Sequence, residues 1–369
     1  MRPLEGLRVV SLEQAVSAPY CTSRMADAGA EVIKVERPEG DFARGYDTAA
    51  GGQSSYFVWL NRGKQSIVLD LRQAEDRLRL EVLIGKADVF VQNLRPGALD
   101  RLGLPIATLR ARHPRLVLCS ITGYGEAGPL ANRKAYDLLV QAESGLVSLT
   151  GTADAMTRVG FSIVDVATGL SAYAAILEAL TNRERTGSGD VIDIAMFDVI
   201  AEWLTVPLLQ HEAGNSPQRI GLAHPSIAPY GAFRSGDGSL VLIAVQNDRE
   251  WVSLATKVLQ RPDLAEDPHF ATNNERVRNR ALTDEHVASG LARFPHAELL
   301  ARLDAAGIAF AEINDMAALS RHPHLRRITV ATSKGSQSLP APPAVFASHE
   351  RQYGAVPAIG AHQPEEDGE

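Results

Sequence analysis

Residues 7–38 read LRVVSLEQAVSAPYCTSRMADAGAEVIKVERP, and this stretch decides the fold. Residues 7–12 form a short β-branched run typical of a buried strand, and residues 31–36 form a second one. The small residues between them follow a helical pattern, which Ser17 could cap and Pro19 could open. A strand, a helix and a strand in this order form a βαβ unit, whose crossover is expected to be right-handed.

Further apolar runs continue this pattern along the chain. Strands are predicted by SIVLDL at 66–71, DVFVQNL at 88–94, RLVLCSI at 115–121 and VIDIAM at 191–196. An amphipathic helix is predicted at 72–87, and a long helix rich in small residues at 161–186. The sequence therefore predicts an α/β fold whose large domain is a doubly wound, mostly parallel sheet.

The character of the chain changes after residue 214, where a loop-like stretch begins. Gly-Asp-Gly at 236–238 lies between two short strand patterns and indicates a hairpin. Helical patterns follow, so we predict a small α+β domain at 221–315. The large domain is predicted at 1–185 and is completed by 330–369, with connections at 186–220 and 316–329.

Composition limits the classes of function. The chain has 369 residues, a net charge of −7 and a pI near 5.8, which argue against a general nucleic-acid-binding protein. The two cysteines, Cys21 and Cys119, lie in apolar runs and are too few for a disulfide framework or a cysteine-rich zinc site. The charged start leads directly into a strand, unlike a signal peptide, and charges or glycines interrupt the apolar segments before bilayer length. We expect a cytoplasmic protein with no nucleic-acid or membrane partner.

The turn after the first strand lacks G-x-G-x-x-G, and no complete P-loop occurs, so no nicotinamide cofactor is expected. The sequence also lacks clusters of metal-ligating residues, so no metal ion is expected. In open α/β sheets, ligands gather at the carboxyl ends of the strands. Arg37, Asn93, Arg95 and Tyr124 all follow predicted strands, and they are therefore candidates for a binding site at that edge.

A second stretch, from Ser120 to Asp165, carries the acids Asp137, Asp154 and Asp165. Asp154 ends the turn TGTAD at 150–154, where unpaired backbone N–H groups lie open to a substrate. Asp is also common in ordinary surface turns, because its side chain bonds nearby backbone. Asp137 fits a cap or a structural partner, and Asp165 opens the long helix, where a carboxylate favours the helix dipole. Position alone leaves both a nucleophile and a structural acid open for Asp154.

The ordered set of motifs resembles the class III CoA-transferases, the family of formyl-CoA transferase and α-methylacyl-CoA racemase, over nearly the whole chain. The N-terminal motifs are LEGLRVVSLEQAVSAPYCT at 4–22, GAEVIKVERPEGDFAR at 29–44, LNRGKQSIVLDL at 60–71 and ADVFVQNLRPGALDRLG at 87–103. They continue with SITGYGEAGP at 120–129, YDLLVQAESGLVSLTGTAD at 136–154, D-x-x-x-G at 165–169, RTGSGDVIDIAMFD at 185–198 and PAIGAH at 357–362.

The resemblance implies a transfer of CoA between an acyl-CoA thioester and a carboxylic acid. The catalytic aspartate of the transferases follows the glycine of the Thr-Gly turn by three residues, which matches Asp154 after Gly151. A carboxylate is ionised at pH 7 and can attack a thioester carbonyl. The resemblance further implies an aspartyl anhydride, an aspartyl–CoA thioester and an interlocked homodimer. It implies no permanently bound cofactor, with coenzyme A or acyl-CoA as substrate.

The resemblance also implies which residues contact the substrates. The CoA-binding set is Gln14, Ala15, Ser17, Arg37, Asn93, Leu94, Ala98 and Arg101, and we add Lys64 as a phosphate contact and Tyr124 at its strand end. The loop GLAHPSIAPYGAF at 221–233 resembles members that act on small dicarboxylates such as mesaconate, itaconate, citramalate or succinate. Its substrate-binding candidates are His224, Ser226 and Tyr230, although a loop histidine without a role remains an alternative for His224.

Two alternatives remain. A 2-methylacyl-CoA racemase needs a second base, which racemases supply as a His before an Asp where this chain has Tyr136-Asp137. A tyrosine with a pKa near 10 is a poor substitute, so the pair favours a transferase. Val16 stands where transferases often place a Gln, which weakens an oxalate or formate interpretation. The other alternative, a non-catalytic CoA-binding protein, predicts CoA-ester affinity without turnover.

Overall fold

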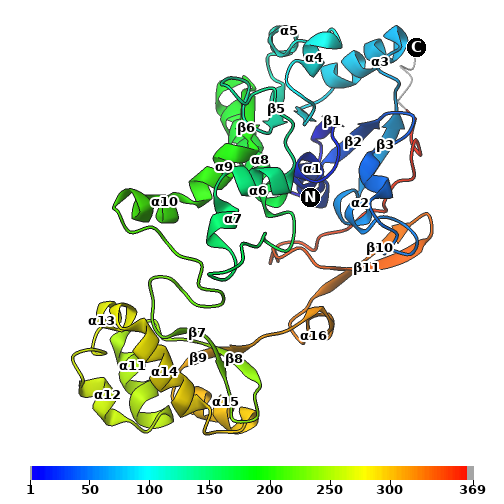
Figure 1. The fold of residues 1–369 in the computed structure, drawn as a ribbon. Helices are drawn as coiled ribbons and strands as arrows, with labels where there is room; N and C mark the ends of the chain where they lie inside the picture. The colour runs from blue at the N-terminus through cyan, green and yellow to red at the C-terminus, as the bar shows by residue number, and fades with distance from the viewer. Residues whose placement is uncertain (1, 364–369) are drawn as a thin grey trace. The chain divides into compact units, whose positions relative to one another are not determined.

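The computed structural model describes residues 2–363, which divide into two compact units (Figure 1). Unit 1 contains the chain up to Val147, Arg158–Leu209 and the part from Arg326 onward. Unit 2 contains Ser148–Thr157 and Gln210–Leu325. A short piece of the chain, Ser148–Thr157, therefore belongs to unit 2 although unit 1 surrounds it in sequence.

Unit 1 is built on a six-stranded sheet with the order β3-β2-β1-β4-β5-β6, and every neighbouring pair in it is parallel. The strands are β1 (Arg8–Leu12), β2 (Glu31–Glu36), β3 (Lys64–Val68), β4 (Val89–Gln92), β5 (Val117–Thr122) and β6 (Val191–Ala195). This is the doubly wound order, which reverses direction beside β1. The α/β class and the parallel sheet predicted from the apolar runs are confirmed.

Both faces of this sheet are buried, because successive residues of a strand point to opposite faces. In β1, Val9 belongs to one apolar cluster with α1 and α8, whereas its neighbour Val10 belongs to another with α3 and α5. Strands buried on both sides need continuous apolar runs, which is the pattern in the sequence. Cys21 and Cys119 are both free and buried in the first cluster, as expected from their apolar surroundings.

Helices follow the strands of unit 1 along the chain, and several of them pack on the sheet. The helices are α1 (Ser17–Asp27), η1 (Phe42–Gly45), α2 (Ser55–Leu60), α3 (Ala74–Gly85), α4 (Ala98–Arg101), α5 (Ile106–Arg112), α6 (Asp137–Glu143), α7 (Leu146–Leu149), α8 (Ile163–Thr186), α9 (Met196–Trp203) and α10 (Thr205–Glu212). The small residues of α8 let α1 approach closely, since a Cβ on Gly169 would overlap the carbonyl oxygen of Ser17. Within the described chain, α8 alone is long and apolar enough for a bilayer, but it packs in the core of unit 1.

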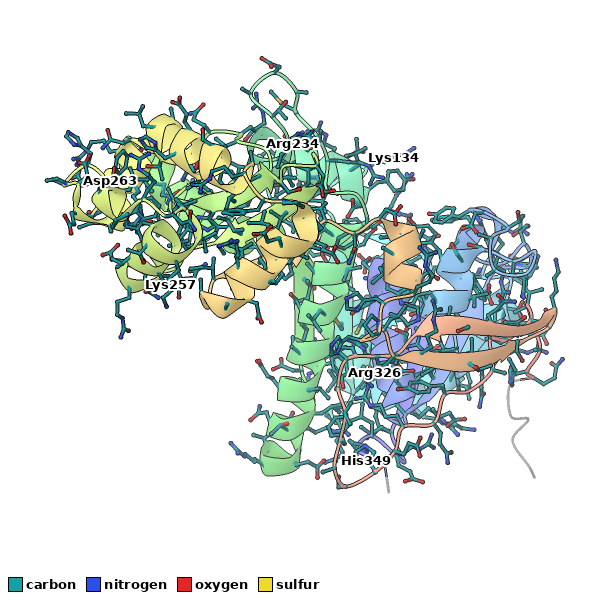
Figure 2. The ribbon with its side chains drawn as sticks, turned by 90° about the horizontal axis from the view of Figure 1, so that it is seen from below. Lys134, Arg234, Lys257, Asp263, Arg326 and His349 are labelled. Carbon is teal, nitrogen blue, oxygen red and sulfur yellow. The ribbon has the colours of Figure 1, made fainter. Side chains whose placement is uncertain are left out.

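Unit 2 contains a three-stranded antiparallel sheet with helices beside it. The strands are β7 (Tyr230–Arg234), β8 (Leu240–Ala244) and β9 (Ala309–Glu312). The helices are α11 (Asp248–Ser253), η2 (Leu254–Val258), α12 (Pro262–Glu266), α13 (Asn273–Arg278), α14 (Arg280–Leu291), α15 (His296–Ala305) and α16 (Met316–Ser320). Buried Trp251 lies in its core, while Lys257 and Asp263 extend outward (Figure 2).

The chain from Arg326 to residue 363 belongs to unit 1, and residues 364–369 of the predicted C-terminal segment lie outside the described residues. It contains the hairpin β10 (Arg327–Thr332) and β11 (Gly335–Pro340). Farther along, the backbone N–H of His362 donates to the Ser66 carbonyl in β3, and the Ser66 N–H donates to His362 Nδ1.

The predicted connection at 186–220 is wrong for most of its length. Strand β6 completes the sheet beside β5, and Met196, Val199 and Ile200 of α9 are buried in the core of unit 1. The chain after β6 forms two helices, α9 and α10, within the stretch that was predicted to be a connection. Only the irregular stretch after α10 remains as a connection, and it belongs to unit 2.

Candidate active site

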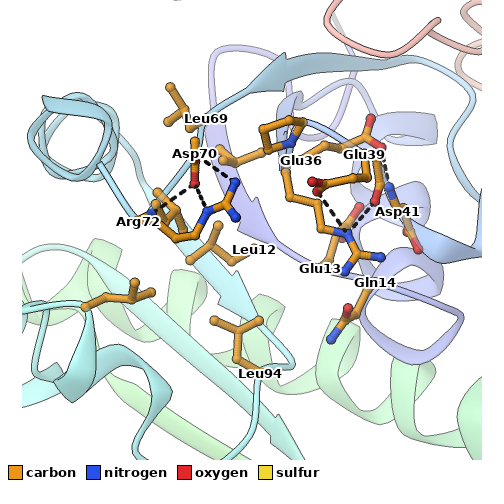
Figure 3. Close-up of a pocket in the computed structure, with 16 residues that line it drawn as sticks. Leu12, Glu13, Gln14, Glu36, Glu39, Asp41, Leu69, Asp70, Arg72 and Leu94 are labelled. Carbon is orange, nitrogen blue, oxygen red and sulfur yellow. Dashed lines mark hydrogen bonds and ion pairs between the residues drawn. The ribbon is translucent and has the colours of Figure 1, made fainter. Parts of the chain in front are cut away.

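A cavity of about 520 Å³ opens at the carboxyl ends of β1, β2 and β3. Its lining comes from the chain that follows each of these strands and from Leu94 and Leu102 (Figure 3). Gln14, Arg37 and Leu94, three of the predicted CoA contacts, line it together. Parallel strands bring these distant residues to one edge of the sheet, which is where open α/β sheets bind ligands.

The loop after β1 is fixed by side chains from other strands. The Asn93 amide accepts a hydrogen bond from the Gln14 N–H at 3.0 Å and donates one to the Gln14 carbonyl at 2.9 Å. The next residue, Ala15, has a φ of 64°, which is unusual for a residue with a Cβ. Its N–H donates to Asp41 Oδ1 at 3.2 Å. Asn93 therefore acts on the backbone of this loop.

Four charged groups are buried beneath the loop. Lys34 lies 2.8 Å from Asp41 and 3.5 Å from Glu13, and Lys64 lies 2.6 Å from Glu13. None of these four side chains is exposed to solvent. Lys34 also donates to the Glu13 carbonyl at 3.2 Å, which ties the cluster to the loop. Burial, only partly offset by Glu13, lowers the pKa of Lys64 to about 8.

This cluster corrects the prediction for Lys64. Its ammonium also donates to the Pro19 carbonyl at 3.1 Å and to Asn61 at 3.2 Å, so all three of its N–H donors have partners inside the protein. A phosphate contact at the surface does not fit this position. Strand β3 begins at Lys64, and the pairing of β3 with β2 directs this side chain into the interior.

Two arginines lie at the cavity. The Arg37 Nε donates to the Gly40 carbonyl at 2.8 Å, and its side chain is more than half exposed. Arg72 is paired with Asp70 at 2.8 Å, as Figure 3 shows, and its side chain is also largely exposed. Sequence analysis missed Arg72, although its place just after the third apolar run was a signal of the same kind as that of Arg37.

The remaining predicted CoA contacts lie outside this cavity. Ala98 lines a second, smaller cavity of about 200 Å³, together with Arg95 and Gly97. Arg101 ends α4 on the surface, close to Gly97, and lines neither cavity. Tyr124 packs against Phe197 at the edge of the core, with ring centroids 6.0 Å apart. Ser17 is buried at the start of α1, and its hydroxyl lies 3.5 Å from the Asn93 amide.

Asp154 lies in a tight turn of unit 2. The Ala155 N–H donates to the Thr152 carbonyl at 3.2 Å, and the Thr157 N–H donates to the Thr150 carbonyl at 3.0 Å. Gly151 has a φ of 112°, and a Cβ there would overlap the Ala155 carbonyl oxygen, so the turn requires glycine. Asp154 is exposed, and its carboxylate has no hydrogen bond or ion pair within residues 2–363.

The two rival acids are placed differently. Asp137 is buried, and its carboxylate accepts hydrogen bonds from the backbone N–H groups of Val164 and Asp165 and from Gln141. This confirms the structural role expected for Asp137, which fixes the start of α8. Burial, with the nearby Asp137 charge, raises the pKa of Asp165 to about 7. A carboxyl group that is half protonated near neutral pH is a poor choice for a permanent anionic nucleophile.

The predicted acceptor residues form one cluster in unit 2. The rings of His224 and Tyr230 stack with centroids 5.2 Å apart and an interplanar angle of 15°. The Ser226 N–H donates to His224 Nδ1 at 3.1 Å, so Nδ1 is the unprotonated nitrogen of the neutral ring. Gln210 donates to the Ser226 hydroxyl at 3.3 Å. No group of three potential metal ligands occurs in the part of the chain that the structure describes.

A model of CoA-transferase family III matches residues 4–363. This chain belongs to CoA-transferase family III. An acetyl-CoA:oxalate CoA-transferase from Acetobacter aceti is 37% identical over 352 residues, which cover 94% of this chain and 90% of the relative. A succinyl-CoA:mesaconate CoA-transferase from Haloarcula hispanica is 35% identical over 339 residues, covering 88% and 84% of the two chains.

A solved structure agrees with this family assignment. A CAIB/BAIF family protein from Brucella suis is 37% identical, with a TM-score of 0.83, and the match covers 98% of this chain and 97% of that one. The resemblance drawn from the ordered motifs is therefore confirmed, and this family III member shares its fold with a solved relative.

Proposed function

We propose that this chain transfers CoA from an acyl-CoA thioester to a small dicarboxylate, with Asp154 as the covalent nucleophile. One observation carries the proposal: in a family III chain, Asp154 lies at the tip of an exposed turn with an unpartnered carboxylate. A free carboxylate is ionised at pH 7 and is available for attack.

The proposed reaction has four exchange steps. The Asp154 carboxylate attacks the thioester carbonyl, the CoA thiolate leaves, and a mixed anhydride forms. The thiolate then attacks the aspartyl carbonyl, which releases the first acid and leaves an aspartyl–CoA thioester. The acceptor carboxylate displaces CoA to form a second anhydride. The thiolate finally attacks the acceptor carbonyl, which yields the new acyl-CoA and restores Asp154. Each step exchanges one acyl bond for another, so no oxidant or reductant is needed.

The cavity of unit 1 supports a site for the nucleotide end of CoA. Arg37 and Arg72 provide guanidinium groups that match phosphate geometry, and each already lies beside an acid or a carbonyl that orients it. We assign Gln14 and Leu94 to its walls and Asn93 to the support of Gln14. Arg101 is assigned a smaller role, because it lines neither cavity.

The choice of a dicarboxylate rests on the relatives and on one loop. The two relatives described above are named for transfer to oxalate and to mesaconate, and both of these acids are dicarboxylates. The His224, Ser226 and Tyr230 cluster offers a ring N–H and hydroxyl groups that could bind a second carboxylate. We also propose a homodimer, because exposed Trp203, Val206, Leu208 and Leu209 form an apolar surface on α9 and α10.

A panel of acyl-CoA donors and dicarboxylates, followed by mass analysis of the CoA esters, tests the activity. Asp154→Asn keeps the size of the side chain, so CoA binding is expected to survive while transfer falls by several orders of magnitude. Hydroxylamine added after an acyl-CoA donor is expected to modify Asp154 alone. Transfer that persists in Asp154→Asn, or a label on Asp137 or Asp165, would contradict the proposal.

One observation favours a second candidate, an α-proton exchange by a 2-methylacyl-CoA racemase. The near-neutral pKa of Asp165 suits a general acid or base. Its weakness is the partner base, since Tyr136 occupies the corresponding position and lies largely exposed. Exchange of the acyl α-proton with deuterium, without CoA transfer to any acid, would support the racemase. CoA-ester binding without either reaction would support a non-catalytic binding protein.

A further inference from the structure

We propose that Arg219 is a positioning residue that clamps the turn carrying Asp154. This inference rests on the proposed function of Asp154 and adds a residue that the motifs do not include. Arg219 lies in the irregular segment between α10 and β7, and it belongs to unit 2 together with the turn.

The guanidinium of Arg219 donates to three backbone carbonyls of one short segment. Its Nε donates to the Thr152 carbonyl at 2.9 Å, one Nη donates to the Ser148 carbonyl at 3.1 Å, and the other Nη donates to the Ala153 carbonyl at 3.0 Å. An arginine has five N–H donors in a rigid planar fork, so three of them are used on this segment. A single side chain thereby fixes both the start and the tip of the turn.

Backbone hydrogen bonds also hold the turn, including one from the Thr157 N–H to the Thr150 carbonyl at 3.0 Å. Within the hairpin, a short bridge pairs Gly151 with Met156, and the Thr152 and Ala155 backbones bond each other. The segment that carries Arg219 makes one further bond to the turn. The Gly221 N–H donates to the Gly151 carbonyl at 2.9 Å. The Asp154 side chain adds no tie of its own within residues 2–363.

The bond to Ala153 links Arg219 to the reacting carboxylate. The Ala153 carbonyl and the Asp154 N–H belong to one rigid peptide plane. Holding the carbonyl therefore fixes the plane from which the Asp154 side chain projects. A covalent nucleophile needs this because its reacting oxygen must lie about 3–3.5 Å from the thioester carbonyl in a defined direction.

A loss of the clamp is expected to slow chemistry and to leave binding intact. A misplacement of about 1 Å can cost on the order of 100-fold in rate, so Arg219→Ala should lower kcat about 100-fold. The KM for the acyl-CoA donor should change less than about twofold, because Arg219 is not among the residues that line the cavity of unit 1. Hydrogen exchange should accelerate in the peptide that contains residues 148–157 and stay unchanged elsewhere.

Arg219→Lys separates the clamp from the charge. Lysine keeps the positive charge but lacks the fork that reaches three carbonyls, so we expect a loss close to that of Arg219→Ala. Methylguanidine added to Arg219→Ala should restore part of the rate of Asp154 labelling. Arg234→Ala is the matched control, because Arg234 is an exposed arginine of unit 2 that donates to the Gly238 carbonyl. It should keep wild-type kcat and wild-type exchange at 148–157.

The outcomes separate this inference from the proposed function. If the wild-type enzyme never labels Asp154 with any donor, the proposed function fails, and this inference fails with it. If the wild-type enzyme labels Asp154 and Arg219→Ala does so at the same rate, only the clamp is overturned. Full activity in Arg219→Lys also overturns the clamp, since charge alone would then suffice. A drop in melting temperature with a uniform rise in exchange across unit 2 would assign Arg219 an ordinary structural role and overturn it as well.

Discussion

The loop after β1 and the turn of Asp154 are held in two different ways. In unit 1, buried Lys34, Asp41 and the Asn93 amide hold the backbone of residues 13–15. In unit 2, partly exposed Arg219 holds the carbonyls of Ser148, Thr152 and Ala153. Removing one partner of a buried charge pair lowers the free energy of unfolding strongly. When an exposed donor is removed, water can take its place on the carbonyl it bound. Damage to the first loop should therefore affect folding and substrate binding, and damage to the turn should affect rate alone.

The largest effect is expected from Lys34→Met. The change leaves the carboxylates of Asp41 and Glu13 buried with less compensation, and removing one partner of a buried pair costs about 3–5 kcal/mol. Urea unfolding followed by circular dichroism measures the loss, and Lys257→Met on the surface of unit 2 is the control. A loss below about 1 kcal/mol would show that the buried cluster does not stabilise unit 1 and would remove the contrast between the two loops.

Acid is expected to weaken unit 1 through Glu36. Burial disfavours the charged form of this carboxylate, but bonds from Arg44 and Ser66 outweigh it and lower its pKa from 4.5 to about 2. A carboxyl group with a lowered folded-state pKa stabilises the fold above its unfolded pKa of 4.5 and loses that effect as the pH falls toward 2. The contribution is on the order of 3 kcal/mol at neutral pH.

The free energy of unfolding of the wild type and Glu36→Gln, measured from pH 2 to pH 7, checks this. The two curves should converge as the pH falls from about 4.5 to about 2. Parallel curves over that window would mean that the protonation of Glu36 does not govern the acid sensitivity of unit 1.

Asn93→Ala should raise the KM for the acyl-CoA donor and leave kcat nearly unchanged. Two hydrogen bonds to Gln14 are lost, each worth about 0.5–1.5 kcal/mol, so KM should rise roughly 5- to 150-fold. Asn93→Asp keeps the acceptor for the Gln14 N–H and should give a smaller rise. Arg219→Ala is expected to do the opposite, lowering kcat while KM stays nearly constant. If Asn93→Ala also lowered kcat at constant KM, the two loops would not differ in the way proposed.

The smallest effect is expected from Ala15→Gly. Glycine relieves the left-handed conformation at φ 64°, and the greater freedom of the unfolded chain offsets much of that gain. The free energy of unfolding should change by less than about 1 kcal/mol, and the KM should stay within about twofold. A large rise in KM would indicate that the Ala15 methyl group itself contacts the substrate.

The sequence by itself determined the architecture of unit 1 and the family. Continuous apolar runs such as RVVSL and VLCSIT favour strands buried on both faces, and their alternation with helical patterns favours a parallel sheet. The Thr-Gly pair also predicted a turn at residues 150–154. The structure explains why this turn needs glycine, because a Cβ at position 151 would overlap the Ala155 carbonyl oxygen. The position of Asp154 in a turn was predicted on the same basis.

Only the tertiary structure decided which side chains support these loops. Lys34 and Lys64 each lie in an apolar run or at its edge, and nothing local shows that both face one buried acid, Glu13. Asn93 meets Gln14 because β4 pairs with β1, and Arg219 meets the Asp154 turn from 66 or more positions along the chain. The physical reason, for Asn93 and Arg219, is that their partners are backbone N–H and C=O groups. Every residue carries the same carbonyl, so the sequence contains no signal that marks which of them an arginine will bind.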